Sequence, residues 1–192
     1  MQPQFYLASA SPRRKQLLKQ LGLRFEVVVA DVDESHRPDE APREYVARIA
    51  RLKAETVAER LGSPKLPVLA ADTAVVVDGD ILGKPEGRED ALKMLARLSG
   101  RAHQVLSSVA LWRAGSLDTA LSESRVVFRA ITPAEAVAYW DTGEPRDKAG
   151  AYGIQGLGGS FVAQLEGSHS GVMGLPLFET AALLQKAGVR VL

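Results

Sequence analysis

The 192-residue sequence contains no cysteine, which excludes disulfide bonds, a thiolate nucleophile and cysteine-ligated zinc. Its three histidines, His36, His103 and His169, are far apart and show no metal-ligand spacing. No apolar run approaches the roughly 20 residues that a membrane-spanning helix needs. The N-terminus also lacks the basic segment and apolar stretch of a signal peptide. We therefore expect a cytoplasmic protein that does not bind membranes.

An excess of one charge sign is also absent, because 24 Lys and Arg residues are balanced by 23 Asp and Glu residues. Proteins dedicated to DNA or RNA normally carry a basic excess, so we expect no nucleic-acid partner. The Gly-x-Ser-x-Gly motif of a nucleophile elbow and the P-loop motif are absent as well. The remaining composition is ordinary, with 46% hydrophobic residues, and fits one domain over residues 1–192.

Helix and strand patterns alternate along the whole chain, which predicts an α/β fold. Two long strand-like segments follow one another through a short turn, so we expect antiparallel as well as parallel pairing. The expected strands cover 5–8, 24–30, 66–71, 74–77, 103–112, 119–130 and 161–165, and the expected helices cover 12–21, 42–61, 89–98 and 175–186.

Two local signals refine this pattern. Thr132-Pro133-Ala134-Glu135 has the residues of a capping box with proline at the first helical position, so it predicts a helix start. The glycine-rich segment 147–160 is predicted to be a loop. Four large side chains are expected in the core: Met94, Trp112, Trp140 and Phe178.

Residues 7–14 read Leu-Ala-Ser-Ala-Ser-Pro-Arg-Arg and have the parts of an anion-binding turn. After a short apolar strand, Ser11 suits a helix N-cap and Pro12 suits the first helical position. Free backbone N–H groups and the positive end of the helix dipole then lie beside two arginines. Arginines in a first helical turn oppose that dipole unless an anion is bound there. The alternative is a capped surface helix with two solvated arginines.

Two charged residues occur where charge is costly to bury. Asp72 lies between the apolar runs 66–71 and 74–77, so its carboxylate must be solvated, paired or metal-bound, or must cap a turn. Lys53 falls within the apolar stripe of the helix predicted over 42–61. It either extends outward to solvent or points into a cleft. Both residues are candidates for a functional site.

Three further segments carry candidate residues. Lys84 occurs in a Gly-Lys-Pro turn that would present its ammonium from a stiff backbone, although most turn lysines are only solvated. The segment 147–156 begins with an Asp-Lys pair and contains Gln155; a purely structural loop would explain its glycines but not this amide. The acidic stretch 31–34 either supplies a Mg²⁺ ligand or is only solvated.

Six segments occur in this order along the chain: S-A-S-P-R-R, A-D-T-A-V-V-V-D-G, G-K-P, L-S-G-R-A-H-Q-V, D-K-A-G-A-Y-G-I-Q-G and V-M-G-L-P-L. Together they resemble the Maf family of nucleoside triphosphate pyrophosphatases over about residues 6–180. The resemblance implies a Maf and inosine-triphosphatase type of α/β fold, in which an elongated, curved mixed sheet and its helices form two lobes around a central cleft. It also implies a cytoplasmic homodimer that hydrolyses a nucleoside triphosphate to the monophosphate and pyrophosphate with a divalent metal ion.

Within the family, Asp72-Thr73 together with the Gly-Ile-Gln-Gly segment is similar to the branch that acts on dTTP and UTP. The resemblance implies that Asp72 is the catalytic carboxylate and, with Glu34, binds a divalent ion such as Mg²⁺, Mn²⁺ or Co²⁺. It implies that Arg13, Thr73 and Gln155 set base specificity. The residues that match the family's nucleotide- and metal-binding cleft are Ser9, Glu34, Lys53, Lys84 and Lys148.

The resemblance leaves the substrate partly open. A carboxamide such as Gln155 can pair with the carbonyl and N–H of uracil or thymine, and after a flip it can also pair with cytosine. Ser107 and His169 depart from the family pattern, in which a threonine and an aromatic residue are common, and these departures bear on fine substrate preference. One alternative is the same reaction on a modified purine such as 7-methyl-GTP. Another is a nucleotide-binding regulator of cell division that does not hydrolyse its ligand.

Overall fold

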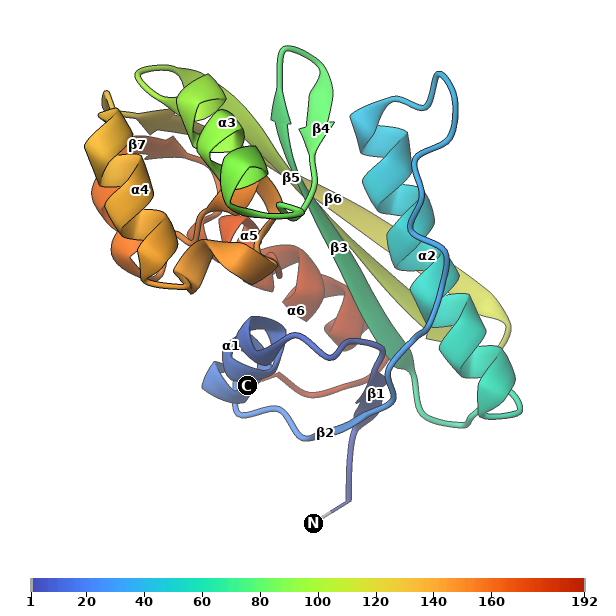
Figure 1. The fold of residues 1–192 in the computed structure, drawn as a ribbon. Coiled ribbons are helices and arrows are strands. Elements are labelled where there is room, and N and C mark those ends of the chain that lie inside the picture. The colour runs from blue at the N-terminus through green and yellow to red at the C-terminus, as the bar shows by residue number, and fades with distance from the viewer. Residues whose placement is uncertain (1, 192) are drawn as a thin grey trace.

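The computed structural model describes residues 2–191 and contains a seven-stranded mixed sheet (Figure 1). The strand order is β2-β1-β3-β5-β6-β7, and β4 pairs with β3 outside this path. β1 pairs in parallel with β2 and β3, whereas all the other pairs are antiparallel, which confirms the predicted mixed α/β fold. The strands are β1 (Phe5–Leu7), β2 (Phe25–Val27), β3 (Val68–Val77), β4 (Asp80–Leu82), β5 (Ala102–Arg113), β6 (Ser116–Phe128) and β7 (Val162–Glu166).

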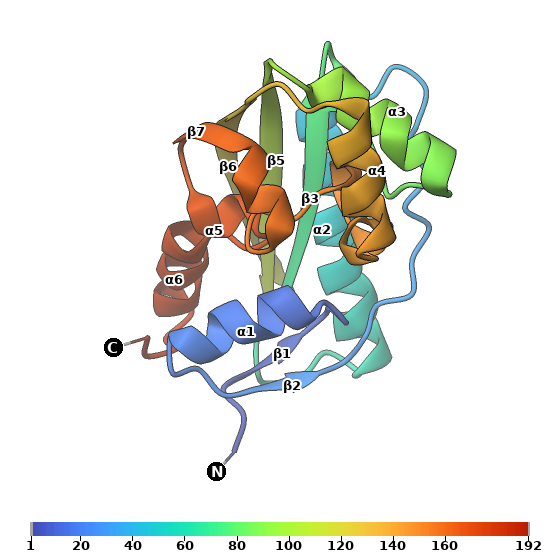
Figure 2. The ribbon, with the colours of Figure 1, turned by 60° about the vertical axis from the view of Figure 1, so that its left-hand side comes forward.

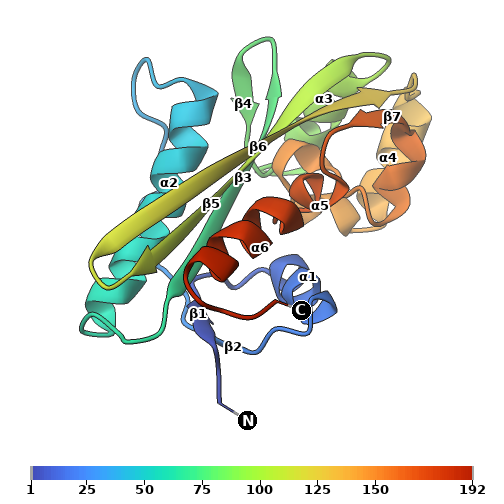
Figure 3. The ribbon, with the colours of Figure 1, turned by 180° about the vertical axis from the view of Figure 1, so that it is seen from behind.

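The helices cover the two faces of the sheet unequally. Helix α2 lies alone on one side of β3 and β5, and the other helices lie on the opposite side (Figures 1 and 3). The α-helices are α1 (Pro12–Gln20), α2 (Pro42–Arg60), α3 (Arg88–Leu98), α4 (Pro133–Asp141), α5 (His169–Val172) and α6 (Leu177–Lys186), and the 3-10 helices are η1 (Glu144–Asp147), η2 (Ala149–Ala151) and η3 (Leu157–Phe161). Within the described residues, no helix is both long and apolar enough to cross a membrane.

The alternation of side chains along β3 divides the core between these two faces. Leu69 packs in the cluster of α1 and α6, and Val75 packs in the cluster of α3 and α4. Ala70 and Val76 point the other way, toward α2. Figure 2 shows the same division, with α2 behind β3 and with α1, α4 and α5 in front of it. Because β3 is buried on both faces, its sequence is nearly all apolar, and a charge within it is conspicuous.

The predicted helix starts are confirmed. The Ser11 side chain accepts a hydrogen bond from the backbone N–H of Arg14, and Pro12 is the first residue of α1. Thr132 and Glu135 form the capping box at the start of α4. These caps depend only on residues a few positions apart, which explains why the sequence pattern predicts them well.

Three expectations about local structure were wrong. The runs 66–71 and 74–77 do not form two strands around a turn, because β3 continues from one run into the other. The segment 147–160, expected to be a loop, contains the whole of η2, the end of η1 and most of η3. Phe178, expected in the core, is 83% exposed, because α6 turns Thr180 and Leu184 inward and Phe178 lies on its outer face. Met94 and Trp112 are buried as expected.

The functional region is created by a gap along one edge of β3. On this edge β1 pairs with Val68 and Leu69, and β4 pairs with β3 only from Val75 onward. Residues 70–74 therefore have no partner strand on that side within the part of the chain that the structure describes. Figure 1 shows β1 near one end of β3 and β4 near the other. Side chains from both faces of the sheet can reach this gap.

Candidate active site

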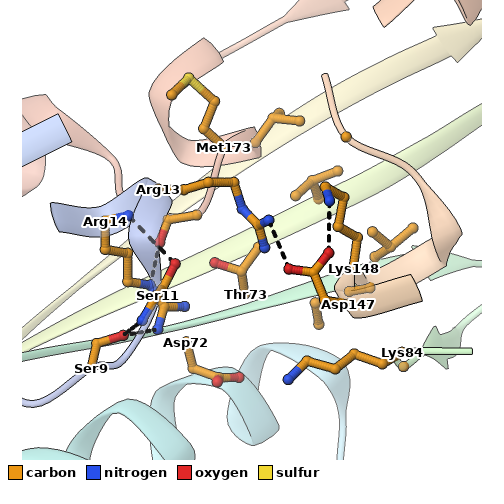
Figure 4. A pocket seen from close by; sticks show the side chains of 18 of the residues that line it. Ser9, Ser11, Arg13, Arg14, Asp72, Thr73, Lys84, Asp147, Lys148 and Met173 are labelled. Carbon is orange, nitrogen blue, oxygen red and sulfur yellow. Dashed lines mark hydrogen bonds and ion pairs between the residues drawn. The ribbon is translucent and has the colours of Figure 1, made fainter. Parts of the chain in front are cut away.

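A pocket of about 860 Å³ lies at this gap. Its walls come from the start of α1, the segment 29–34, helix α2, strand β3, the turn after β4, and residues 144–156 (Figure 4). The structure thus brings together residues from Ala8 near the start of the chain to Gly174 near its end. All nine residues predicted for the site line this pocket: Ser9, Arg13, Glu34, Lys53, Asp72, Thr73, Lys84, Lys148 and Gln155.

A buried ion-pair group lies on the α2 side of the pocket. Lys53 Nζ is 2.8 Å from Oδ1 of Asp72 and 2.9 Å from Oε1 of Glu34. The Lys53 and Asp72 side chains are only 9% and 8% exposed, whereas that of Glu34 is 51% exposed. Lys53 therefore points into the cleft rather than outward to solvent, and Asp72 is paired rather than capping a turn.

The environment of Asp72 combines opposing electrostatic effects. Burial raises the pKa of its carboxyl group above the ordinary aspartate value, while the positive charges of Lys53 and Arg14 act in the other direction. Burial likewise lowers the pKa of Arg14, and the negative charge of Asp72 opposes that shift. An ionised carboxylate at this depth is held by cations on two sides of it.

The start of α1 brings both arginines to the pocket. Arg14 donates from Nε to the carbonyl of Gly174 at 2.8 Å and from Nη1 to Oγ of Ser9 at 3.1 Å. Arg13 instead reaches Asp147, with Nη1 3.3 Å from Oδ2. Lys148 Nζ lies 2.7 Å from the other oxygen of Asp147 (Figure 4). Two of the predicted phosphate-binding cations therefore share one exposed carboxylate.

Lys84 and Gln155, like Glu34, are exposed members of the predicted set. Within residues 2–191, Lys84 forms no hydrogen bond or ion pair, so its ammonium is available to a ligand. Gln155 lies in the segment between Gly153 and Gly158, whose ends are held by other side chains. Gln155 lines the pocket, and its role in base recognition remains a prediction.

The segment that carries Gln155 is anchored by Glu144. One Glu144 oxygen accepts from the Tyr139 hydroxyl at 2.7 Å and from the N–H of Gly158 at 3.1 Å. The other oxygen accepts from the N–H of Leu157 at 2.9 Å. The Tyr139 hydroxyl also accepts from the N–H of Gly153 at 3.1 Å. A side chain at residue 156 would collide with the Glu144 carboxylate and displace it from these hydrogen bonds.

Sequence reasoning missed Glu144 and Tyr45, both of which line the pocket. The Tyr45 hydroxyl donates to the backbone carbonyl of Glu34 at 2.9 Å and so fixes the acidic stretch. Burial, together with the negative charges of Asp72 and Glu34, raises the pKa of Tyr45 to about 12, so its hydroxyl stays protonated. Neither residue lies in a motif whose spacing marks it, because the backbone groups that they bind lie 11 to 14 residues away in the chain.

The carboxylates of the pocket bear on whether it can hold a divalent metal ion. Within residues 2–191 no group of three or more His, Cys, Asp or Glu side chains is placed to hold one. The carboxylates of Asp72 and Glu34 nevertheless converge on a single cation, the Lys53 ammonium. Mg²⁺ in nucleotide sites is usually held by one or two carboxylates, with phosphate oxygens and waters completing its shell. The residues present fit such an ion.

The chain is similar to known proteins over nearly its whole length. A protein from Methylobacillus flagellatus named "dTTP/UTP pyrophosphatase" is 53% identical over 186 residues, covering 97% of this chain and 94% of its own. One from Bordetella parapertussis with the same name is 55% identical over 196 residues, covering 98% and 95%. The Ham1 protein of Staphylococcus aureus matches with a TM-score of 0.51 and 19% identity over 95% and 96% of the two chains, which supports the fold alone. The Maf-like protein family model matches residues 4–187, and the chain belongs to the Maf family.

Proposed function

We propose that this protein hydrolyses dTTP and UTP to the nucleoside monophosphate and pyrophosphate. The observation that carries the proposal is the buried carboxylate of Asp72 at the wall of a pocket that also contains several cations. The names of two relatives at 53% and 55% identity support the reaction and the substrate class. A protein that only senses a nucleotide has no need of a buried carboxylate beside the phosphate-binding groups.

The cations of the pocket suit a triphosphate. Such a ligand carries about three to four negative charges, and it would meet the N-terminus of α1 together with nearby arginine and lysine side chains. An arginine can bind phosphate oxygens in a bidentate manner, whereas a lysine acts as a point charge. The residues proposed for phosphate and nucleotide binding are Ser9, Arg13, Lys53, Lys84 and Lys148.

The reaction needs a water molecule in line with the departing pyrophosphate. The water oxygen forms a bond to the α-phosphorus, the bond from this phosphorus to the bridging oxygen breaks, and pyrophosphate leaves with that oxygen. Asp72 orients the water and accepts its proton, which then passes to solvent. Lys53 neutralises charge next to the carboxylate, so positioning and electrostatics supply most of the catalysis.

A divalent ion, Mg²⁺, Mn²⁺ or Co²⁺, fits the same residues. Asp72 and Glu34 would hold it, and it would neutralise charge on the phosphate oxygens. Tyr45 keeps the backbone of Glu34 in place for this role.

Base preference is assigned to Arg13, Thr73 and Gln155, which all line the pocket. A buried site whose polar groups match one base rejects others because those groups are left unpaired. We therefore expect pyrimidines to be preferred over purines.

The remaining features of the proposal follow from family resemblance. One seven-stranded sheet spans the chain from β1 to β7, which supports treating residues 1–192 as one domain with a cleft between two lobes. We propose a cytoplasmic homodimer without nucleic-acid or membrane partners.

Product analysis tests the proposal directly. Purified protein is incubated with Mg²⁺ or Mn²⁺ and with dTTP, UTP, CTP, ATP, GTP or 7-methyl-GTP, and pyrophosphate is assayed separately from orthophosphate. Pyrophosphate with dTMP and UMP is the expected result. Activity on 7-methyl-GTP alone would preserve the reaction but overturn the substrate assignment. Nucleotide binding without turnover would indicate a sensor instead.

A further inference from the structure

A pair of hydroxyl groups joins two neighbouring strands beside the pocket. Thr73 of β3 is directly opposite Ser107 of β5 in the antiparallel register. Their hydroxyl oxygens are 2.8 Å apart, and Oγ of Ser107 is also 2.7 Å from the carbonyl oxygen of Gly171. Ser107 is 1% exposed, so no water competes for its hydrogen bonds.

The direction of these hydrogen bonds follows from counting protons. A serine hydroxyl has one proton to donate, and a carbonyl oxygen can only accept. Ser107 therefore gives its proton to Gly171 and must accept the hydrogen bond from Thr73. The Thr73 proton is then directed into the sheet, and lone pairs remain on its oxygen. No other hydrogen bond to this oxygen is formed within the described residues.

Thr73 lines the pocket, so these lone pairs are available to a ligand (Figure 4). We infer that Ser107 is a positioning residue that makes Thr73 an obligate hydrogen-bond acceptor, and that Thr73 accepts from the imide N3–H of a uracil or thymine base. This inference rests on the proposed function and deepens it, because Gln155 alone matches either uracil or cytosine by flipping its amide.

The two pyrimidines differ at the atom in question. Uracil and thymine carry a proton on N3, whereas N3 of cytosine is an acceptor without a proton. A hydrogen-bond acceptor placed next to N3 therefore binds uracil and thymine. In cytosine it meets the lone pair of N3 and is repelled. Losing one such hydrogen bond corresponds to a preference of about ten-fold or more for UTP over CTP.

The test compares binding and turnover of three nucleotides: UTP, CTP and N3-methyl-UTP, in which a methyl group replaces the N3 proton. Dissociation constants are measured by calorimetry without divalent ions, and kcat/KM is measured with Mg²⁺. The wild-type protein is expected to prefer UTP over both other nucleotides by about ten-fold or more in each measurement.

Ser107→Ala frees the Thr73 proton to turn toward the ligand, so its UTP-to-CTP ratio is expected to fall to within about two-fold of unity. Ser107→Thr retains the hydroxyl and is expected to restore the ratio. Ser108→Ala is the matched control, because Ser108 is equally buried in β5 but donates to Ala120 rather than contacting Thr73. Its ratio is expected to equal that of the wild type.

The outcomes separate this inference from the proposed function. Equal affinity of the wild-type protein for UTP, CTP and N3-methyl-UTP would overturn the inference, whether or not any of them is hydrolysed. So would a folded Ser107→Ala variant with the wild-type ratio. Failure to hydrolyse every nucleotide would overturn the proposed function, while the binding ratios would still decide the role of Thr73.

Discussion

Asp72 combines two properties that are unfavourable for a carboxylate, since it is buried and lies in the middle of an apolar strand. Such a group persists in a protein when partners compensate for the lost hydration. Lys53 is its direct partner, and Glu34 shares the same ammonium. Replacing one carboxylate oxygen of Asp72 by an amide nitrogen therefore tests its catalytic role with little change in the shape of the side chain.

We predict that Asp72→Asn keeps the fold and lowers kcat for dTTP and UTP by at least about 10²-fold, since the amide cannot accept the proton of the attacking water. Steady-state kinetics and thermal unfolding of the same preparation provide the measurement. Asp118→Asn is the control, because this aspartate pairs with Lys186 outside the pocket and its loss should leave kcat unchanged. Near-normal turnover by folded Asp72→Asn protein would remove the carboxylate from the mechanism.

His103 is a buried histidine, 3% exposed, whose Nε2 forms a hydrogen bond with the Tyr152 hydroxyl at 2.8 Å. Its Nδ1 has no hydrogen-bond partner among the described residues, and burial lowers the pKa of His103 to about 4. At pH values between the ordinary histidine pKa and this lowered pKa, His103 binds a proton in the unfolded chain but not in the folded chain. Stability is therefore lost as the pH falls through this window, by up to about 3 kcal/mol.

Urea unfolding at about pH 7 and about pH 5 measures this effect when the wild type is compared with His103→Gln. The glutamine side chain does not titrate, so acidification should reduce the variant's free energy of unfolding by less than that of the wild type. Parallel losses in the two proteins would show that other groups cause the pH dependence.

At the scale of elements, the site depends on how loops and strand ends are held. The edge of β3 is open only between the end of β1 and the start of β4, and Asp72 and Thr73 occupy that interval. Residues 153–158 are held at both ends by Glu144 and Tyr139. A paired strand and an anchored loop thus both line the pocket.

We predict that Glu144→Ala lowers the free energy of unfolding by about 1–3 kcal/mol, because three hydrogen-bond donors lose their acceptor. It should also reduce the ratio of kcat/KM for UTP over ATP, because Gln155 is no longer held at the pocket.

We predict that Gln155→Ala reduces the ratio of kcat/KM for UTP over ATP more than it reduces the turnover of UTP itself. Kinetics on both nucleotides and denaturant unfolding provide the measurements.

Glu135→Ala is the matched control for Glu144→Ala. Glu135 also accepts a backbone hydrogen bond, but it does so at the start of α4 and away from the pocket. Its replacement should leave the UTP-to-ATP ratio unchanged. An unchanged ratio in Glu144→Ala would mean that the loop keeps its position without this anchor.

At the scale of the whole molecule, the pocket connects elements from both halves of the chain. Its lining runs from Ala8 to Gly174 and includes residues on both faces of the sheet. A nucleotide that contacts all of these elements binds the folded state alone, so its binding free energy adds to the stability of the fold.

We predict that UTP at 100 times its dissociation constant, without divalent ions, raises the free energy of unfolding by about 2.7 kcal/mol. Uridine at the same concentration should have a much smaller effect, because it lacks the phosphates that the arginine and lysine side chains are proposed to bind. Denaturant unfolding with each ligand provides the measurement. Equal stabilisation by uridine and UTP would contradict the assignment of these cations to phosphate binding.

Much of this molecule follows from the sequence alone. The helix starts at Ser11 and Thr132 depend on neighbouring residues. The long strands and the mixed α/β class depend on simple periodicity. All of these features can therefore be predicted without the fold. The ordered motifs also indicated the family and nine residues that line the pocket. The helix starts and the periodicity are local features, whereas the family and the nine residues follow from the resemblance of the ordered motifs.

The tertiary structure decided what depends on distant partners. It showed that β3 continues through Asp72, because Lys53 from another element offsets the charge that suggested a turn. It placed Phe178 outside the core, and it brought the Ser107 hydroxyl within 2.8 Å of the Thr73 hydroxyl and 2.7 Å of the Gly171 carbonyl. The burial of a charge and the direction of a proton depend on atoms that folding brings within about 3 Å. No spacing along the chain encodes those distances.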